Sequence, residues 1–247
     1  YWGKKHINEF KELGHNILVS DLNDKNLELY SNDKNIETTL DYQKILNDSD
    51  VYAVTICAPN SLHFKIAKES LLANKHVLVE KPISENINEA DELISIAEKC
   101  NLTLSVGHIF RFNNSIDMAK KMIHNNELGQ IRTIQIKWTN DEYTFQPDLH
   151  ERIDDRDIIT DLGVHAFDIL TYLTNKDPDY IVSIGESFKM KDKIEAINIL
   201  GKSDKTIINI ELSWVTPPKK RLLNVIGEKQ SLEIDCISQK VISTCVS

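Results

Sequence analysis

Short apolar runs alternate with helical patterns through the first 110 residues, and this alternation limits the possible fold more than any other feature of the chain. The runs lie at 17–19, 51–57, 76–79 and 102–106 and are rich in β-branched residues. Strands of this kind are typically covered on both faces. The repeated strand–helix–strand order predicts a parallel, doubly wound sheet, in which ligands bind beyond the carboxyl ends of the strands.

Helical patterns fill the intervals between these runs. One helix is predicted from Asn60 to about residue 73. A second follows Asn86, whose side chain is placed to cap the backbone near Glu89, three residues later. The apolar residues of this second helix recur at helical spacing, and we expect all of them to be buried: Ile87, Ala90, Leu93, Ile94 and Ala97.

The chain begins without Met and inside an amphipathic pattern. Ile7, Phe10 and Leu13 recur at helical spacing, and Gly14 follows as a helix stop. Because a natural amino terminus rarely lies within such a pattern, we expect the sequence to be truncated at this end.

A different periodicity begins after about residue 127. Ile134, Ile136 and Trp138 alternate with polar residues, and the stretch 208–214 repeats this alternation. Period two predicts a sheet with one apolar and one polar face, which is typical of antiparallel strands. Further strands are expected near 180–188, 194–200, 221–226 and 231–244, with one helix near 164–173 and a turn at Pro217-Pro218. We therefore predict an α/β protein with a Rossmann-type domain at 1–110, whose doubly wound parallel sheet lacks its first strand, and an α+β domain with a large open, mostly antiparallel sheet at 111–247.

The composition excludes several classes of protein. With 41% hydrophobic and 27% charged residues, the chain is typical of globular proteins and not of disordered ones. Its net charge of −9 argues against nucleic-acid binding, and no apolar run approaches the roughly 20 residues that span a membrane.

The four cysteines, Cys57, Cys100, Cys236 and Cys245, are widely spaced. We expect them to be reduced, buried apolar residues without a metal, in a cytoplasmic protein.

One glycine and one aspartate have the spacing of a dinucleotide-binding fold. Gly3 would be the last glycine of a GxGxxG turn, and Asp21 follows the first apolar run. Glycines at this turn let backbone N–H groups approach a pyrophosphate, and a carboxylate about 20 residues later accepts hydrogen bonds from ribose hydroxyls. That carboxylate would repel a 2′-phosphate, which favours NAD over NADP. Alternatively, Asp21 is an ordinary turn residue.

The triplet Glu80-Lys81-Pro82 follows an apolar run directly. A lysine at the carboxyl end of a buried strand reaches the crevice where ligands bind, and it can hold a substrate hydroxyl or exchange a proton. The alternative is a lysine that pairs with Glu80 on a surface loop.

Asp161 and His165 are four residues apart, so they share one face of a helix. Histidine suits proton transfer near neutral pH. By itself, this pair is more often a contact that stabilises a helix than a catalytic dyad.

Taken in order, these motifs resemble the Gfo/Idh/MocA family of nicotinamide-dependent sugar oxidoreductases. The ordered set comprises Tyr1-Trp2-Gly3, Asp21, Ala58-Pro59-Asn60 with His63, Glu80-Lys81-Pro82, and Asp161 with His165. The resemblance covers nearly the whole chain. It implies a Rossmann domain that binds NAD, followed by a domain whose open sheet forms a homodimer or homotetramer.

The resemblance also implies a role for each matching residue. Lys81, Asp161 and His165 form the catalytic group: His165 takes the proton from the oxidised hydroxyl, Lys81 binds the same oxygen, and Asp161 orients the sugar. The cofactor is held by Tyr1, Trp2, Gly3, Asp21, Thr55, Ala58, Pro59, Asn60, His63, Glu80 and Lys81, with Arg111 near cofactor or substrate or, alternatively, in a surface ion pair.

Two departures from the family pattern affect these expectations. The paired glycines that often precede the Asp161 motif are replaced by residues 156–159, Arg-Asp-Ile-Ile. The first strand, two glycines and the last strands are also missing, so we expect the chain to be a fragment, truncated at both ends, that binds NAD poorly.

The segments around 106–113, 161–165 and 214–221 are most similar to the branch that oxidises UDP-N-acetylhexosamines or their uronates at C3. In this interpretation Lys219, Lys220 and Arg221 would meet a diphosphate, unless they form an ordinary solvated turn. An inositol or free-sugar dehydrogenase is the enzymatic alternative. A non-catalytic NAD-binding sensor or scaffold is the other alternative.

Overall fold

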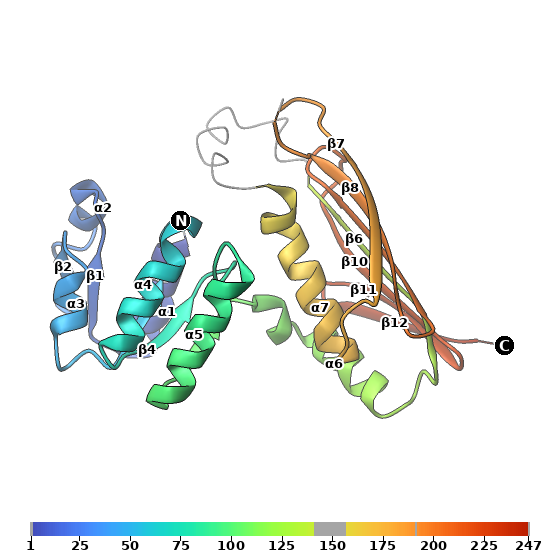
Figure 1. Cartoon of the computed structure of the whole chain (residues 1–247), viewed down its shortest axis with the longest axis horizontal. Helices are drawn as coiled ribbons and strands as arrows, with labels where there is room; N and C mark the ends of the chain where they lie inside the picture. The colour runs from blue at the N-terminus through green and yellow to red at the C-terminus, as the bar shows by residue number, and fades with distance from the viewer. Residues whose placement is uncertain (1, 141–156, 191, 247) are drawn as a thin grey trace. The chain divides into compact units, whose positions relative to one another are not determined.

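The computed structural model describes residues 2–140, 157–190 and 192–246. The chain divides into two compact units, residues 1–107 and 108–247 (Figure 1). None of the helices in the described part of the chain is both long enough and apolar enough to cross a membrane.

The first unit is built on parallel strands, as the sequence predicts. Strand β1 (Ile17–Ser20) pairs with β2 (Ile36–Thr39), while β3 (Ala53–Ile56), β4 (His76–Val79) and β5 (Leu104–Val106) form a second sheet in that order. No strand among the described residues joins the two sheets. Strand β2 was not predicted, because its residues Ile-Glu-Thr-Thr form no continuous apolar run.

Five helices accompany these strands: α1 (Trp2–Glu12), α2 (Asp24–Glu28), α3 (Gln43–Asn47), α4 (Asn60–Leu72) and α5 (Ile87–Cys100). The predicted cap of α5 is confirmed, since Asn86 Oδ1 accepts from the Glu89 N–H at 3.0 Å. The predicted burial is wrong at Ile87 and Ile94, which are 77% and 46% exposed. Leu93 and Ala97 of α5 are buried in the core of this unit, and Ile96 is partly buried against it.

The second unit contains a seven-stranded sheet in the order β12-β11-β10-β6-β9-β8-β7. The strands are β6 (Ile131–Thr139), β7 (Tyr180–Glu186), β8 (Ala196–Ser203), β9 (Thr206–Ser213), β10 (Lys220–Gly227), β11 (Gln230–Asp235) and β12 (Lys240–Cys245). The sheet is mostly antiparallel, but β6 and β9 pair in parallel. The predicted mostly antiparallel sheet is confirmed, and this parallel pair is the exception among the described strands. Alternation shows which face of a strand is buried and favours an antiparallel sheet, but it does not fix the direction of each neighbouring strand.

Helices cover one face of this sheet (Figure 1). They are the 3₁₀ turn η1 (Ile109–Phe112), α6 (Asn114–His124), the π-helical turn η4 (Ile159–Gly163) and α7 (Val164–Thr174). Ile116, Ile169 and Leu173 pack there against buried strand residues such as Ile136 and Ile210. No described helix of this unit covers the other face, where Val182, Leu200 and Ile207 are each more than half exposed.

The cysteines only partly meet the expectation of burial. Cys236 is buried and Cys57 is half-buried, but Cys100 and Cys245 are exposed. Cys100 is the last residue of α5 and Cys245 ends the edge strand β12, and positions at the ends of elements are easily reached by solvent.

Candidate functional site

In the first unit, the predicted cofactor residues follow the ends of several elements. Trp2 and Gly3 open α1, Asp21 follows β1, Thr55 lies on β3, Ala58, Pro59 and Asn60 connect β3 to α4, and Glu80 and Lys81 follow β4. Tyr1 lies outside the described residues. A methyl group added at Gly3 would lie 3.8 Å from Cys57 Cβ, which is an ordinary contact. The structure therefore gives Gly3 no packing role that another small residue would not fill.

Asp21 makes local bonds at the end of β1. Its Oδ1 accepts from the Asn23 N–H at 2.8 Å, and its Oδ2 accepts from Asn26 Nδ2 at 3.0 Å. These are the bonds of a turn residue, which was one of the two alternatives. Each carboxylate oxygen can accept a second hydrogen bond, so a ribose contact stays compatible with this geometry.

His63 is buried and connects two loops that carry predicted site residues. Its Nε2 lies 2.9 Å from the Ala58 carbonyl oxygen and its Nδ1 lies 2.6 Å from that of Pro82. Both ring nitrogens are thus directed at backbone carbonyls. His63 holds the turn at Lys81-Pro82 against the β3–α4 loop and leaves neither nitrogen directed at a ligand.

Lys81 is half-buried directly after β4, and Glu80 beside it is buried. Glu80 Oε1 lies 2.8 Å from His6 Nε2 on α1. Burial raises the pKa of Glu80, but the bond and charge of His6 outweigh it and bring the pKa below its usual value. Glu80 is therefore an ionised partner of His6.

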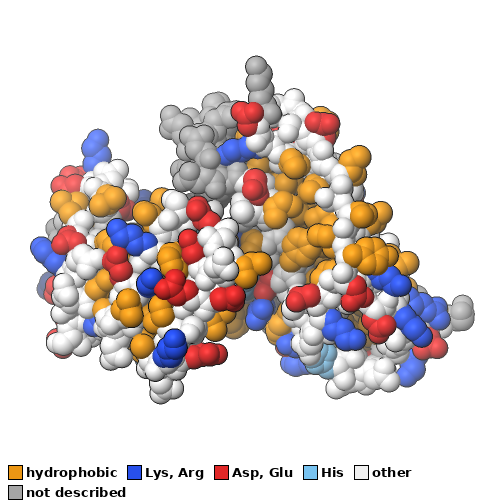
Figure 2. Space-filling model, in the orientation of Figure 1, with side chains coloured by type: hydrophobic (Ala, Val, Ile, Leu, Met, Phe, Trp, Pro, Cys, Tyr) orange, Lys and Arg blue, Asp and Glu red, His pale blue; other side chains and the backbone are white. Residues whose placement is uncertain are grey.

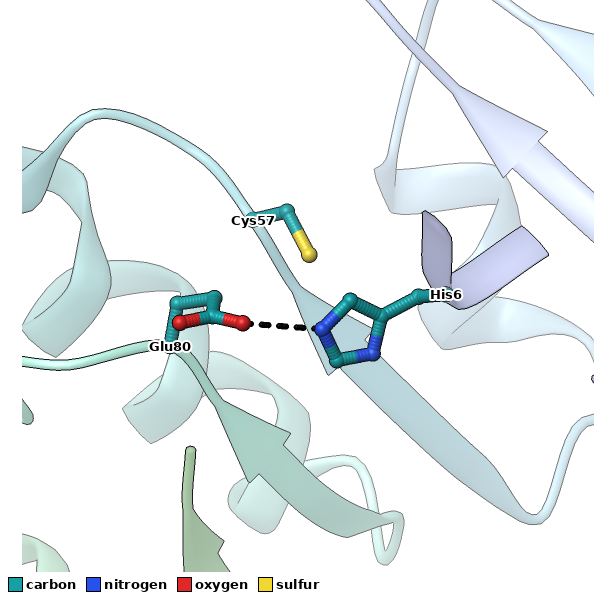
Figure 3. A group of neighbouring side chains, drawn as sticks. All are labelled: His6, Cys57 and Glu80. Atoms are coloured by element: carbon teal, nitrogen blue, oxygen red, sulfur yellow. Dashed lines mark hydrogen bonds and ion pairs between the residues drawn. The ribbon is translucent and has the colours of Figure 1, made fainter. Parts of the chain in front are cut away.

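His6, Cys57 and Glu80 form a cluster that the sequence analysis missed (Figure 3). Hydrogen bonds to Cys57 and then to Glu80 raise the pKa of His6 to about 10, so the imidazole is protonated at neutral pH. The only sequence signal was that Cys57 ends one predicted strand and Glu80 directly follows another. Nothing local connected them to a helix residue more than 50 positions earlier.

In the second unit, Asp161 and His165 lie at the entrance to α7. Asp161 is in the π-helical turn η4, in which the Val164 N–H bonds to the Ile159 carbonyl oxygen. Asp161 Oδ2 accepts from the indole N–H of Trp214 at 3.0 Å, and Trp214 is buried after β9. Asp161 thus has a fixed partner from a distant strand, and π turns of this kind are frequent at functional sites.

Aromatic rings surround His165. Its ring centroid lies 5.2 Å from that of Phe110 and 5.9 Å from that of Trp138. Arg221 lies over the Trp138 ring at 5.1 Å and donates to the Thr139 carbonyl oxygen and to Asn140 Oδ1, both at 2.8 Å. Arg221 is buried, so it is not the solvated or diphosphate-binding turn residue that we expected. Arg221 instead packs against the indole ring of Trp138, which in turn lies beside His165.

Arg111 forms an ion pair with Asp168 of α7. Its Nε lies 3.0 Å from both carboxylate oxygens and its Nη2 lies 2.6 Å from Oδ1. This bidentate pair matches the ion-pair alternative. It raises the pKa of Arg111 further above its usual value.

Comparison with known proteins identifies a family for both units. The family model of the GFO/IDH/MocA oxidoreductases, described as an NAD-binding Rossmann fold, matches residues 1–108. The model of the GFO/IDH/MocA C-terminal domain matches residues 116–233.

Individual relatives show how far the similarity extends. A glucose-6-phosphate 3-dehydrogenase of Bacillus subtilis is 26% identical over 226 residues, 88% of this chain and 61% of that protein. A UDP-N-acetylglucosamine 3-dehydrogenase of Acidithiobacillus ferrooxidans is 28% identical over 191 residues, 77% of this chain and 57% of that protein. The chain thus spans 57–61% of the length of these curated relatives.

The fold is also similar to solved structures. The structure of the UDP-N-acetylglucosamine 3-dehydrogenase GnnA from Acidithiobacillus ferrooxidans superposes with a TM-score of 0.79 at 24% identity. The match covers 93% of this chain and 74% of that one. This likeness confirms the predicted fold class.

Proposed function

The chain belongs to the GFO/IDH/MocA family of oxidoreductases, and we propose that it transfers hydride between a CH–OH carbon of a sugar and the nicotinamide of NAD. When bound, the cofactor supplies the hydride acceptor. The residues of this chain then bind the two reactants and move the proton.

The chemistry of the first unit fits a nicotinamide cofactor. The carboxylate of Asp21, at the end of β1, suits the ribose hydroxyls and opposes a 2′-phosphate. The first turn of α1 offers backbone N–H groups that the helix itself does not use. Trp2, Gly3, Thr55, Ala58, Pro59, Asn60 and Glu80 are the other residues that we propose for this role, and Arg111 is proposed near cofactor or substrate.

The observation that carries the proposal is the arrangement of Asp161 and His165. They are four residues apart at the start of α7, Trp214 fixes the carboxylate of Asp161, and aromatic rings pack beside His165. We propose that His165 accepts the hydroxyl proton, that Lys81 donates a hydrogen bond to the same oxygen, and that Asp161 orients the sugar. An imidazole is well matched to this proton transfer at neutral pH.

The proposed substrate is a UDP-N-acetylhexosamine or its uronate, oxidised at C3. Both curated relatives described above are 3-dehydrogenases by name, one for a UDP-sugar and one for a sugar phosphate. Their names support oxidation at C3 more strongly than they support the nucleotide. An inositol or free-sugar dehydrogenase is the alternative substrate class, and an NAD-binding scaffold without chemistry is the alternative of another kind.

The test is NADH absorbance on the protein at its full natural length, with NAD and a panel of UDP-N-acetylhexosamines, their uronates, glucose 6-phosphate, inositol and glucose. Lys81→Met should lower turnover by at least about 100-fold while changing NAD affinity little, because proton transfer and oxyanion contacts contribute on this scale. Lys65→Met, at an exposed lysine on α4, is the matched control. Equal turnover in both variants, or NAD binding with no turnover on any substrate, would contradict the proposal.

We also propose that the open face of the seven-stranded sheet joins copies of this chain in a homodimer or homotetramer. Tyr180 and Val182 on β7 adjoin Leu200 on β8 and Ile207 on β9, and all four side chains are more than half exposed. A shallow hollow is lined by these residues together with Gly201, Lys202 and Lys205. Apolar side chains gather on the surface of the second unit (Figure 2), and apolar surface patches commonly mark protein interfaces.

A further inference from the structure

Three side chains with metal-binding atoms converge in the first unit. His6 comes from α1, Cys57 follows β3 and Glu80 follows β4. One ligand atom of each lies within 4.8 Å of the other two, and the three side chains point toward one another (Figure 3). Three elements that are distant in sequence thus contribute one donor each to one point.

We propose that His6, Cys57 and Glu80 form a binding site for one Zn²⁺ ion. Imidazole nitrogen, thiolate sulfur and carboxylate oxygen are the protein ligands of zinc, and a site with three of them leaves the fourth tetrahedral position to water. This inference does not depend on the proposed function, because it concerns only whether the chain binds the metal.

The distances require a small adjustment. With bond lengths of about 2.0–2.3 Å, ligand atoms around tetrahedral zinc lie about 3.3–3.6 Å apart. The 2.8 Å contact between His6 Nε2 and Glu80 Oε1 would therefore lengthen, while the most separated pair, within 4.8 Å, would move closer. Rotations of the three side chains are enough for changes of about 1 Å.

Neighbouring groups already orient two of the ligands. His6 Nδ1 lies 3.3 Å from Thr55 Oγ1, which leaves Nε2 directed at the cluster. A second hydrogen bond of this kind is usual for histidines that bind metals. Glu80 packs against Gly107, where an added methyl group would lie 3.0 Å from Oε2. A larger residue at position 107 would therefore displace the carboxylate.

Zinc bound here would hold His6 as a neutral imidazole and Cys57 as a thiolate, so its binding would be coupled to proton release, as it is at other metal sites with deprotonated ligands.

The experiment measures metal binding directly on the metal-free chain. Zn²⁺ is titrated in competition with a coloured chelator, and Co²⁺ serves as a spectroscopic probe. We expect one Zn²⁺ per chain, and a Co²⁺ complex with visible bands of tetrahedral geometry and a near-ultraviolet band from sulfur ligation. Cys57→Ser should remove the sulfur band and weaken zinc binding at least tenfold, and His6→Gln should weaken it similarly. Cys100→Ser, at an exposed cysteine outside the cluster, is the control and should change neither.

A second measurement needs no variant. In the unaltered chain, zinc should slow the alkylation of Cys57 at least tenfold and leave the alkylation of Cys100 unaffected. Mass spectrometry of the peptides that contain the two cysteines measures both rates. Any one of three results would overturn the proposal. They are the absence of stoichiometric zinc binding, a Co²⁺ sulfur band that survives in Cys57→Ser, and equal alkylation of Cys57 with and without zinc. Loss of dehydrogenase activity plays no part in these readouts, so the two proposals fail separately.

Discussion

At the scale of single residues, the carboxylate of Asp161 depends on one distant donor. The indole N–H of Trp214 reaches it at 3.0 Å, although the two residues are 53 positions apart. Hydrogen bonds to charged groups contribute about 1.5–3 kcal/mol, and tenfold in an equilibrium or rate corresponds to about 1.4 kcal/mol. The orientation of Asp161 should therefore be sensitive to this one bond.

Trp214→Phe tests that dependence, because phenylalanine keeps an aromatic ring and lacks the N–H. We expect kcat/KM for the best substrate of the panel to fall about 10- to 100-fold, with NAD affinity unchanged. The melting temperature, followed by circular dichroism, separates this loss from unfolding. If kcat/KM is unchanged in a folded variant, the bond from Trp214 has no part in orienting Asp161 for the reaction.

Cys236 gives a second prediction at this scale. It is 4% exposed, and burial followed by the charge of Asp235 raises its pKa to about 12. Since the thiolate is the reactive form, Cys236 should react with iodoacetamide at least tenfold more slowly than the exposed Cys100 and Cys245 in the native protein. Peptide mass spectrometry measures the three rates, and urea should abolish the difference. Rapid native alkylation of Cys236 would contradict its burial.

At the scale of elements, one buried carboxylate organises the connection between β7 and β8. Glu195 is fully buried, and its Oε2 accepts from the backbone N–H groups of Phe188 at 2.6 Å, Lys189, and Met190 at 3.1 Å. The backbone carbonyl oxygen of Glu195 accepts from the backbone N–H of Trp214 at 2.8 Å. The same residue thus shapes the β7–β8 loop and holds the strand end that carries Trp214.

Glu195→Ala should therefore lower the free energy of unfolding of this unit by about 3 kcal/mol or more, because three N–H groups lose their acceptor. Glu233→Ala, at an exposed position of β11, is the matched control and should change it by less than about 0.5 kcal/mol. Urea denaturation followed by tryptophan fluorescence is suitable, since Trp138 and Trp214 both lie in this unit. Equal stability of the two variants would show that water replaces the carboxylate without cost.

The turn that carries Asp161 shows what an element adds to a sequence motif. The spacing to His165 predicts a shared helix face, and α7 does begin at Val164. The π-helical turn before it inserts an extra residue into the helical repeat. No periodic signal in residues 157–163 predicts that insertion, because periodicity reflects burial and not the hydrogen-bond pattern of a single turn.

At the scale of the whole molecule, the uncovered sheet face determines how copies of the chain would associate. Val182 and Leu200 are direct neighbours across β7 and β8, with exposed fractions of 61% and 51%. If this face joins two copies, its burial would remove a patch that is otherwise costly to hydrate.

The double variant Val182→Glu and Leu200→Glu should dissociate the proposed oligomer, because it places like charges within an apolar contact. Size-exclusion chromatography with light scattering should show a shift to the monomer mass. Met118→Glu, at an exposed apolar residue of α6, is the control and should leave the mass unchanged. A monomeric unaltered protein, or a double variant that keeps the oligomer, would contradict the proposed interface.

The sequence by itself determined the apolar strands of the first unit, the helices α1, α4, α5 and α7, the two kinds of sheet and the motifs at their ends. These features are local: burial periodicity, caps such as Asn86 and turn residues are all encoded within a few positions. The strand at His76–Val79 and the alternation in β6 and β9 were predicted for this reason.

Only the tertiary structure decided which side chains meet. His6 and Glu80 are 74 positions apart, and the predicted roles of Cys57 as a plain apolar residue and Arg221 as a turn residue both ignored their neighbours. The exposure of Ile87 and Ile94 and the parallel pairing of β6 with β9 were likewise decided by packing. A periodic pattern specifies which face of an element is buried, whereas the residue that lies opposite it depends on how distant elements pack.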